Sequence, residues 1–230
     1  MSVNIAIDGP AGAGKSTIAK LVAKKKGYIY VDTGAMYRAM ALYLHRQGVD
    51  PAGAESDDAA KAEEVKVKIV ELCTKPDISI KYENGEQIVL LDGENVNGLI
   101  RSEEVSRMAS VSSAVPEVRV RLVQLQQKLA SESDVVMDGR DIGTVVLPNA
   151  DVKVYLTASV EERARRRFKE QQEKGVECDL ETIKKDIAER DHRDMTRKTS
   201  PLKQAEDATL VDSSDMTIEQ VAEHILSLCK

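Results

Sequence analysis

The chain has 230 residues, enough to bury a sizeable core as one domain or as one domain with a substantial insertion. Its 33 basic and 39 acidic residues give a formal charge of −6, which argues against a general nucleic-acid coat, because such proteins bind through basic surfaces. The cysteines Cys73, Cys178 and Cys229 form no C-x-x-C pair, so neither a disulfide framework nor a zinc site is expected. The sequence shows no charged and apolar leader and no run approaching ~18 apolar residues. We therefore expect a soluble, cytoplasmic protein with no membrane or nucleic-acid partner.

Short apolar runs alternate with segments of helical pattern along most of the chain. The runs have the length and near-continuous apolar character of buried parallel strands, and they lie at residues 3–9, 28–32, 134–139, 151–156 and 208–212. The predicted helices between them are 15–26, 35–47 and 159–174, which end at Gly27, Gly48 and Gly175. Ser159 and Glu162 predict a capping box at the start of the last helix. This alternation predicts a three-layer α/β fold.

Residues 65–96 break the alternation. "VKVKIVEL" (65–72) and "ISIKY" (78–82) read as strands, and a turn over Glu83-Asn84-Gly85-Glu86 leads into "QIVLLDG" (87–93). No crossover helix separates these predicted strands. We therefore expect a small antiparallel sheet inserted on the α/β core.

The string "GPAGAGKS" (9–16) satisfies G-x-x-x-x-G-K-[ST] and stands between a predicted strand and a predicted helix, as a P-loop must. Its glycines let backbone N–H groups converge on phosphate oxygens, Lys15 reaches the β and γ phosphates, and Ser16 can ligate Mg²⁺. The predicted ATP-binding residues are Gly9, Pro10, Ala11, Gly12, Ala13, Gly14, Lys15, Ser16 and Thr17. A glycine-rich turn with nothing bound is the alternative, and the strand and helix context disfavours it.

A second string, Thr74-Lys75-Pro76-Asp77, matches the N/T-K-x-D motif by which GTPases read guanine. It lies inside the predicted insertion, where it reads as a turn between two strands of the small sheet. A GTP-dependent switch is thus an alternative that the position of this motif disfavours.

Asp138 ends the predicted strand 134–139, as a Walker-B-type carboxylate does. This position predicts that Asp138 lies near Mg²⁺ or its water molecules, and that Arg140 lies over the reaction centre. The alternative is a tight Asp138-Gly139 turn formed for local reasons.

The segment 179–198 carries an apolar helical face, from Leu180 to Ile187, that becomes charged further along. The charged part of the same face is Arg190, Asp194 and Arg197. We expect these side chains to point into a cleft, where Asp194 accepts from ribose hydroxyls and the arginines reach a phosphate or a base edge. A solvated run of charges is the alternative.

A second basic segment, "ERARRRFKE" (162–170), places Arg163, Arg166 and Arg167 on one helical face. On a mobile segment between the fourth and fifth strands, this face can close as a lid over a transferring phosphoryl group. The alternative is a solvated helix whose arginines pair with Glu162 and Glu170.

The triplet Asp32-Thr33-Gly34 is also the one that carries the catalytic carboxylate of aspartic proteases. Those enzymes need two such carboxylates facing each other in a β-rich body, and this chain has one triplet, at the end of a predicted parallel strand. A homodimer with one triplet per chain is the only protease alternative. We interpret the triplet as the floor of an acceptor site, where the next helix N-terminus and Arg38 favour a phosphate.

Several motifs, in this order and over nearly the whole chain, resemble the bacterial cytidylate kinase family. They are "GPAGAGKST", "DTGAMYRAMA", "DGRDIGTVV" followed by "PNADVK", "SVEERARRR", and "ERDHRDMTR" followed by "PL". The resemblance implies a P-loop kinase with a five-stranded parallel sheet of adenylate-kinase type, an inserted small sheet and a short lid. It implies phosphoryl transfer from ATP, with Mg²⁺, to CMP or dCMP, and it indicates a monomer. The expected core is about 1–32, 130–158 and 200–230, the acceptor-binding part about 33–129, and the lid about 159–199.

The resemblance also implies roles for individual residues. Asp32, Thr33 and Arg38 would hold the acceptor phosphate and its surroundings, and many relatives have Ser where this chain has Thr33. The remaining acceptor residues would be Ser110 and Arg119 for the cytosine ring, Arg140 for the phosphate, Asp141 for the base, Arg190 and Asp194 for the sugar, and Arg197 for the base pocket. "MASVSSAVP" has three serines within four positions, so the match at Ser110 is the least secure.

Such a transfer depends mostly on alignment and charge neutralisation, and no general base is required. The expected catalytic residues are Lys15, Arg140, Arg163 and Arg167. The alternatives are a uridylate, adenylate or shikimate kinase, and a nucleic-acid-associated ATPase, which the acidic balance disfavours.

Overall fold

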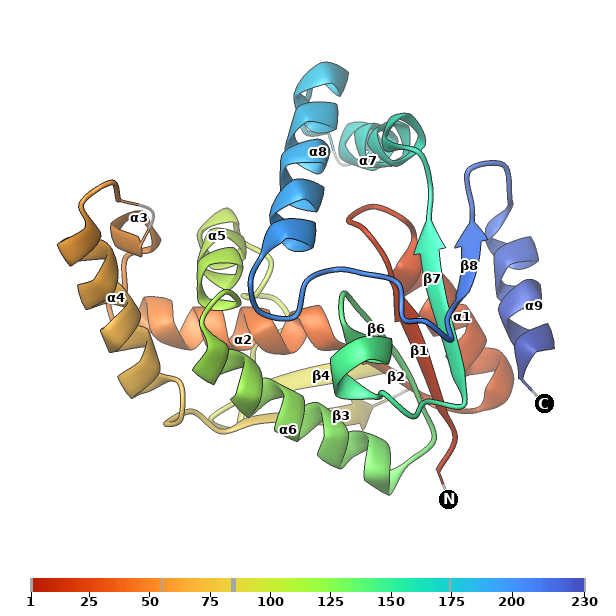
Figure 1. Ribbon diagram of the computed structural model, residues 1–230, viewed down its shortest axis with the longest axis horizontal. Coiled ribbons are helices and arrows are strands. Elements are labelled where there is room, and N and C mark those ends of the chain that lie inside the picture. Colours follow the sequence, from red (N-terminus) through yellow and green to blue (C-terminus); the bar gives the residue numbers. More distant parts are fainter. Residues whose placement is uncertain (1, 55, 84–85, 174, 230) are drawn as a thin grey trace. The chain divides into compact units, whose positions relative to one another are not determined.

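The computed structural model describes residues 2–54, 56–83, 86–173 and 175–229. The chain forms two compact units: the first spans Met1–Val31 and Ala130–Lys230, and the second spans Asp32–Leu129. Figure 1 shows the elements of both units along the chain. Within the part of the chain that is described, no helix is both long and apolar enough to cross a membrane.

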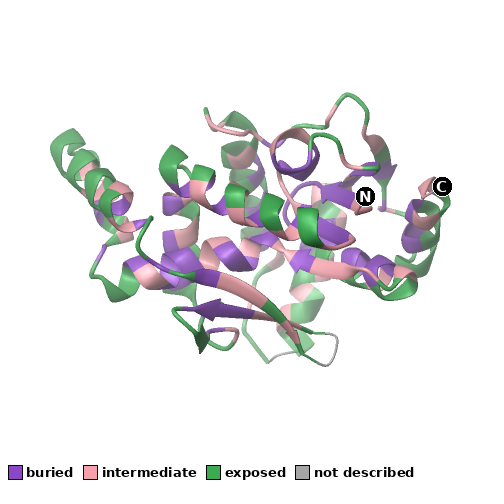
Figure 2. Ribbon diagram, turned by 90° about the horizontal axis from the view of Figure 1, so that it is seen from below, coloured by how far each residue is buried: buried purple, intermediate pink, exposed green. Residues whose placement is uncertain are grey.

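A five-stranded parallel sheet forms the centre of the first unit, as predicted. Its strands are β1 (Asn4–Asp8), β2 (Ile29–Asp32), β6 (Val135–Gly139), β7 (Val152–Thr157) and β8 (Thr209–Asp212), in the order β2-β6-β1-β7-β8. Strands β1 and β6 are buried along most of their length, which is why their sequences are almost continuously apolar. Figure 2 shows the ribbon coloured by the burial of each residue. All five predicted strands are therefore confirmed.

The helices of the first unit follow the predicted strand–helix alternation. They are α1 (Lys15–Lys26), the single π-helical turn η1 (Ile142–Val146), α7 (Val160–Glu173), α8 (Leu180–Thr196) and α9 (Ile218–Leu228). Helices α1 and α9 lie side by side, and their apolar faces join the sheet in one core (Figure 1). Helix α1 ends where predicted, because Gly27 adopts the left-handed conformation (φ 71°) that stops a helix.

Helices α7 and α8 pack against each other through a small apolar cluster of their own. Its buried members are Ala164, Ile183 and Ile187. Ser159 Oγ accepts from the Glu162 N–H at 3.2 Å, but the Ser159 N–H donates to Ser214 Oγ, so only half of the predicted capping box forms as expected. Lys174, the last residue of the predicted helix, lies outside the described residues.

The second unit contains the antiparallel sheet and the helices that cover it. Its elements are α2 (Thr33–Arg46), α3 (Pro51–Ala54), α4 (Ala59–Leu72), β3 (Ile78–Glu83), β4 (Glu86–Leu91), β5 (Glu94–Asn95), α5 (Glu103–Ser112) and α6 (Pro116–Glu132). Strands β3, β4 and β5 form a sheet in that order, and the predicted hairpin is confirmed by the pairing of β3 with β4. Asn84 and Gly85 of the predicted turn lie outside the described residues.

The prediction of a strand at residues 65–72 is wrong, because this segment is the second half of α4. Asp58 caps the helix by accepting from the N–H groups of Ala60 and Lys61, and strong helix formers follow it. Val65 and Ile69 are four residues apart and face the core, whereas Val67, on the other face, is 47% exposed. The alternating valines thus belong to a helix with one buried face. The Thr74–Asp77 turn consequently joins a helix to a strand, and not two strands.

Candidate active site

The carboxyl ends of neighbouring parallel strands meet at one edge of the sheet. The register of β1 with β6 pairs Ile7 with Asp138 and Asp8 with Gly139, so Asp8 and Asp138 stand at adjacent strand ends. In open α/β sheets, ligands bind at this edge. The P-loop begins here, directly after Asp8.

Glycine is required at two kinds of position in the P-loop. A Cβ on Gly9 would lie 1.9 Å from the carbonyl oxygen of Leu156 in β7, so only glycine allows the loop to pass this close to the sheet. Gly12 and Gly14 have φ of 77° and 87°, in the left-handed region that L side chains rarely adopt. The sequence signature therefore corresponds to a loop that turns sharply between β1 and α1.

Lys15 is the first residue of α1 and is buried. Its Nζ donates to the carbonyl oxygen of Pro10 at 2.7 Å, which folds the side chain back over the loop. Burial holds its pKa well below the ordinary value, and the charge of Arg140 acts in the same direction, against Asp138 and Asp8. A bound anion would therefore strongly favour the protonated form of Lys15.

Ser16 and Asp138 are hydrogen-bonded to each other. The Ser16 hydroxyl donates to Asp138 Oδ2 at 2.9 Å, and the Tyr30 hydroxyl donates to Asp138 Oδ1 at 2.8 Å. Because the Ser16 hydroxyl gives its proton to Asp138, its oxygen lone pairs remain available to a cation. Hydroxyl and carboxylate oxygens are the donors that Mg²⁺ prefers, so the residues present fit this ion.

Asp8 is a buried carboxylate that sequence reasoning missed. Its two oxygens accept from the N–H groups of Ile142 and Gly143, at 2.8 and 2.7 Å. Burial raises its pKa to about 6, although these two N–H groups act in the opposite direction. Asp8 directly precedes the P-loop, and these hydrogen bonds connect it to the start of η1. Helix η1 begins directly after Arg140 and Asp141.

Arg140, Asp141, Asp194 and Arg197 come together in the first unit, as the sequence predicts. Arg140 Nε donates to Asp194 Oδ2 at 2.8 Å, while Arg197 lies 3.9 Å from both Asp141 and Asp194. Burial alone would raise the pKa of Asp194, but Arg140 and the other arginines outweigh it and lower that pKa below the ordinary value. The cluster is a network of ion pairs and not a solvated run of charges.

The helical face of α8 that becomes charged continues inward at a different residue from the one predicted. Arg190 is exposed, although its charge acts on Lys15 and Asp194, whereas its neighbour Asp191 is buried. Asp191 forms an ion pair with Arg163 of α7, with 2.7 Å between Oδ2 and Nη1. Asp191 is four residues beyond Ile187, so a strict helical period from the apolar face would have found it.

The three arginines of α7 have different surroundings. Arg163 is buried, and it donates to the carbonyl oxygens of Ala11 and Ala158. Arg166 forms an ion pair with Glu162, at 3.0 Å, and donates to the Ser213 carbonyl oxygen. Arg167 is exposed. The local pairing with Glu162, which was the alternative interpretation of this helix, is therefore present for Arg166.

In the second unit, the predicted phosphate-binding residues surround the start of α2. Asp32 caps the helix by accepting from the Ala35 N–H at 2.9 Å, and its other oxygen accepts from Arg38 Nη2 at 3.1 Å. Thr33 is buried in the first turn, and a Cβ on Gly34 would lie 3.2 Å from both Asp32 and Arg38. Arg101, which sequence reasoning missed, lies 3.9 Å from Asp32.

The two predicted base-reading residues are in different environments. Arg119 is buried, lies 5.4 Å from the ring centroid of Tyr37, and donates to the Ser113 carbonyl oxygen. Ser110 is exposed on α5, whereas Ser112 is fully buried. Of the closely spaced serines, Ser110 is thus open to a ligand and Ser112 is not.

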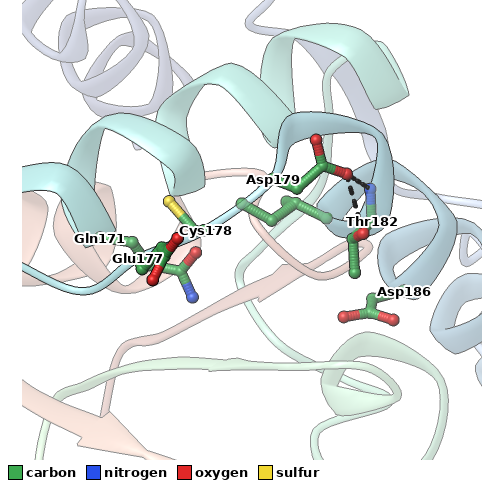
Figure 3. Close-up of a pocket in the computed structure, with 7 residues that line it drawn as sticks. Gln171, Glu177, Cys178, Asp179, Thr182 and Asp186 are labelled. Carbon is green, nitrogen blue, oxygen red and sulfur yellow. Dashed lines mark hydrogen bonds between the residues drawn. The ribbon is translucent and has the colours of Figure 1, made fainter.

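A cavity of about 440 Å³ lies elsewhere in the first unit, between the end of α7 and the start of α8. Figure 3 shows Glu177, Asp179 and Asp186 around it, with Asp179 hydrogen-bonded to Thr182. An acidic lining opposes a polyphosphate, and none of the predicted site residues lines this cavity.

Comparison with known proteins agrees with the motifs. The model of the family described as cytidylate kinase matches residues 5–230. The chain belongs to the cytidylate kinase family. A cytidylate kinase of Caldicellulosiruptor saccharolyticus is 52% identical over 226 residues, which cover 98% of this chain and 95% of that protein. One from Streptococcus pneumoniae is 48% identical over 224 residues, covering 97% and 96%.

The family membership confirms the resemblance seen in the motifs and the predicted class of enzyme, a nucleoside monophosphate kinase. The observed fold has the two sheets that the resemblance implied, a five-stranded sheet and a small three-stranded one. The expected parts, namely core, acceptor-binding part and lid, remain predictions, as do the roles of the individual site residues.

Proposed function

We propose that this cytidylate kinase family member transfers the γ-phosphoryl group of ATP to CMP or dCMP, giving CDP or dCDP. One observation carries the proposal: Asp8, directly before the P-loop, accepts from the Ile142 and Gly143 N–H groups, so the P-loop lies beside the segment that carries Arg140. A donor-binding cation and an acceptor-binding cation in one electrostatic cluster are what in-line phosphoryl transfer requires. The names of the relatives supply CMP as the acceptor.

ATP binds to the P-loop in this proposal. Its phosphates accept hydrogen bonds from the backbone N–H groups of the loop and of the α1 N-terminus. Lys15 gives up its hydrogen bond to the Pro10 carbonyl oxygen and reaches the β and γ phosphates. Ser16 and Asp138, which are hydrogen-bonded to each other, would hold Mg²⁺. When bound, Mg²⁺ neutralises phosphate charge.

The predicted acceptor residues of the first unit begin with Arg140. Arg140 neutralises the phosphate of the acceptor. Asp194, kept ionised by three arginines, accepts from the sugar hydroxyls, and Arg190 donates to them. Asp141 and Arg197 meet the base. The predicted acceptor residues of the second unit are Asp32, Thr33 and Arg38 for the phosphate, and Ser110 and Arg119 for the cytosine ring.

The reaction needs alignment more than covalent help. An acceptor phosphate is already an anionic nucleophile, so no side chain has to remove a proton from it. Lys15 and Arg140 neutralise the transferring group, with Arg163 and Arg167 of the lid as further predicted contributors. Closure of the α7–α8 lid would keep water from acting as the acceptor.

An acceptor panel tests the proposal. Purified protein is mixed with ATP, Mg²⁺ and one of CMP, dCMP, UMP, AMP and shikimate, and the release of ADP is measured. We expect rapid release with CMP or dCMP, and loss of that release when EDTA removes Mg²⁺. Preferred turnover of UMP, AMP or shikimate would assign another kinase activity, and GTP hydrolysis without acceptor dependence would indicate a switch.

A further inference from the structure

Two buried charges meet at one residue of the P-loop. Arg163 of α7 and Asp191 of α8 form an ion pair of 2.7 Å, and their side chains are only 5% and 10% exposed. Both also contact the backbone of Ala11, which lies between the glycines of the loop. We call Arg163, Asp191 and the Ala11 backbone the Ala11 clamp.

The clamp contacts both polar atoms of the Ala11 backbone. Arg163 Nη1 donates to the Ala11 carbonyl oxygen at 2.8 Å, and the Ala11 N–H donates to Asp191 Oδ1 at 3.4 Å. Arg163 is itself fixed by donating from Nε to the Ala158 carbonyl oxygen at 2.9 Å. The guanidinium therefore has its partners in the P-loop, in Asp191 and in the strand end before α7.

Holding the Ala11 carbonyl also orients the next N–H group. The carbonyl and the N–H of a trans peptide point in opposite directions, and the bond between Ala11 and Gly12 is trans. Because the carbonyl points to Arg163, the Gly12 N–H points away from Arg163. Gly12 has a left-handed φ of 77°, and in a P-loop such N–H groups converge on the phosphates.

Helix α7 packs closely against this part of the loop. A Cβ on Gly12 would lie 3.3 Å from the Cβ of Arg163, so the loop and the helix are in near contact. Arg163 directly precedes Ala164, and Asp191 is one turn beyond Ile187, and both apolar residues belong to the core of the α7–α8 hairpin. The hairpin thus presents the ion pair to the loop from a packed support.

We propose that Arg163 and Asp191 are positioning residues for ATP, which hold the Ala11–Gly12 peptide in the orientation that binds phosphate. On this inference Arg163 acts through the P-loop, and not on the transferring phosphoryl group as the sequence predicts. The inference rests on the proposed use of ATP as the donor. It is tested by ATP binding without any acceptor, so a failure to phosphorylate CMP would leave the test intact.

The test compares ATP dissociation constants, measured by titration calorimetry, for variants of the clamp. Asp191→Asn keeps the shape of the side chain and removes its charge, and Arg163→Lys keeps the charge but lacks the planar fork that spans several acceptors. We expect Asp191→Asn to weaken ATP binding by roughly 10-fold or more, with the KM for CMP nearly unchanged. Arg163→Lys should fall between this variant and the unaltered protein.

Two further variants separate positioning from stability. In the double variant Arg163→Met with Asp191→Leu, an apolar pair replaces the buried ion pair, so the unfolding temperature should largely recover while ATP affinity stays low. Asp207→Asn is the matched control. It removes the carboxylate that pairs, at 2.6 Å, with the buried Lys153, which also donates to the Pro148 carbonyl oxygen. ATP affinity should be unchanged in this control.

Some results would overturn the inference. Unchanged ATP affinity in Asp191→Asn would do so, as would a loss no larger than that of Asp207→Asn. If Arg163→Lys lowered kcat and left ATP affinity unchanged, Arg163 would act directly on the transferring group. Recovery of ATP affinity in the apolar double variant would show that the pair contributes only to folding.

Discussion

The buried carboxyl group of Asp8 makes the stability of the protein depend on pH in an unusual direction. Burial raises its pKa to about 6, from an ordinary value of 3.8. Between these two values the folded protein holds a proton on Asp8 that the unfolded chain has released. Unfolding then releases a proton, so this group stabilises the folded state fully below about pH 4, and the contribution is lost as the pH rises through about 6. Most paired carboxylates act in the opposite direction.

The size of the effect follows from the two pKa values. One pKa unit corresponds to about 1.4 kcal/mol, so the rise from 3.8 to about 6 corresponds to a loss of about 3 kcal/mol in the free energy of unfolding. Asn cannot titrate, so Asp8→Asn removes this dependence. The variant should therefore be more destabilised near pH 4 than near pH 7, by about 2–3 kcal/mol.

Urea unfolding followed by circular dichroism, at a series of pH values from about 4 to 7, measures this difference for the two proteins. Asp194→Asn is a suitable comparison, because the pKa of Asp194 lies below 3.8 and its contribution is lost only at lower pH. A difference for Asp8→Asn that does not change with pH would refute the reasoning. A difference that grew with pH would mean that the Ile142 and Gly143 N–H groups outweigh burial.

Three further predictions concern turnover, acceptor binding and the P-loop. Lys15→Met should lower kcat by at least about 100-fold while circular dichroism shows an unchanged fold, and near-normal steady-state rates would contradict the role of Lys15. Asp194→Asn should raise the KM for CMP roughly 10-fold and affect the KM for ATP much less, because Arg140 loses its ionic partner and the sugar hydroxyls lose a charged acceptor; equal increases would contradict the assignment. Gly9→Ala should destabilise the protein by more than about 2 kcal/mol in urea unfolding, because its Cβ would lie 1.9 Å from the Leu156 oxygen; normal stability would show that the loop can move aside.

The strands of the core could be predicted because a strand buried on both faces has a nearly continuous apolar sequence. "NIAID" of β1 and "VVMDG" of β6 are almost continuously apolar up to the residue that carries charge. Helix α1 could be placed to the residue, since the P-loop lysine begins it and Gly27 ends it. In these segments local preference and tertiary environment agree.

Helix α4 was not predictable from the same patterns. "VKVKI" alternates like a strand, and only the preceding Asp58 cap and alanine-rich turn favour a helix. Packing decides the outcome, because Ile69 is fully buried while Val67 remains 47% exposed. A short apolar run with two compatible periods has no single interpretation until its buried face is known.

At the candidate site, residues within a recognisable motif were easier to find than residues that support one. Arg140 and Asp194 stand in distinctive strings, and the structure joins them at 2.8 Å. Asp8 and Asp191 act on backbone groups far away in the sequence, at Ile142 and at Ala11. Nothing in the local sequence shows where such a carboxylate will point, because its partner is set by the tertiary fold.

The triplet Asp32-Thr33-Gly34 shows how strongly such surroundings determine chemistry. In an aspartic protease the carboxylate faces a second carboxylate, and the two share a proton. Here one oxygen of Asp32 accepts from the Ala35 N–H, which caps α2, and the other accepts from Arg38, with Arg101 nearby. Both carboxylate oxygens are therefore engaged, one by the helix cap and one by Arg38. The triplet that carries the catalytic carboxylate of a protease in one fold thus begins a helix in another, where its Asp32 holds Arg38.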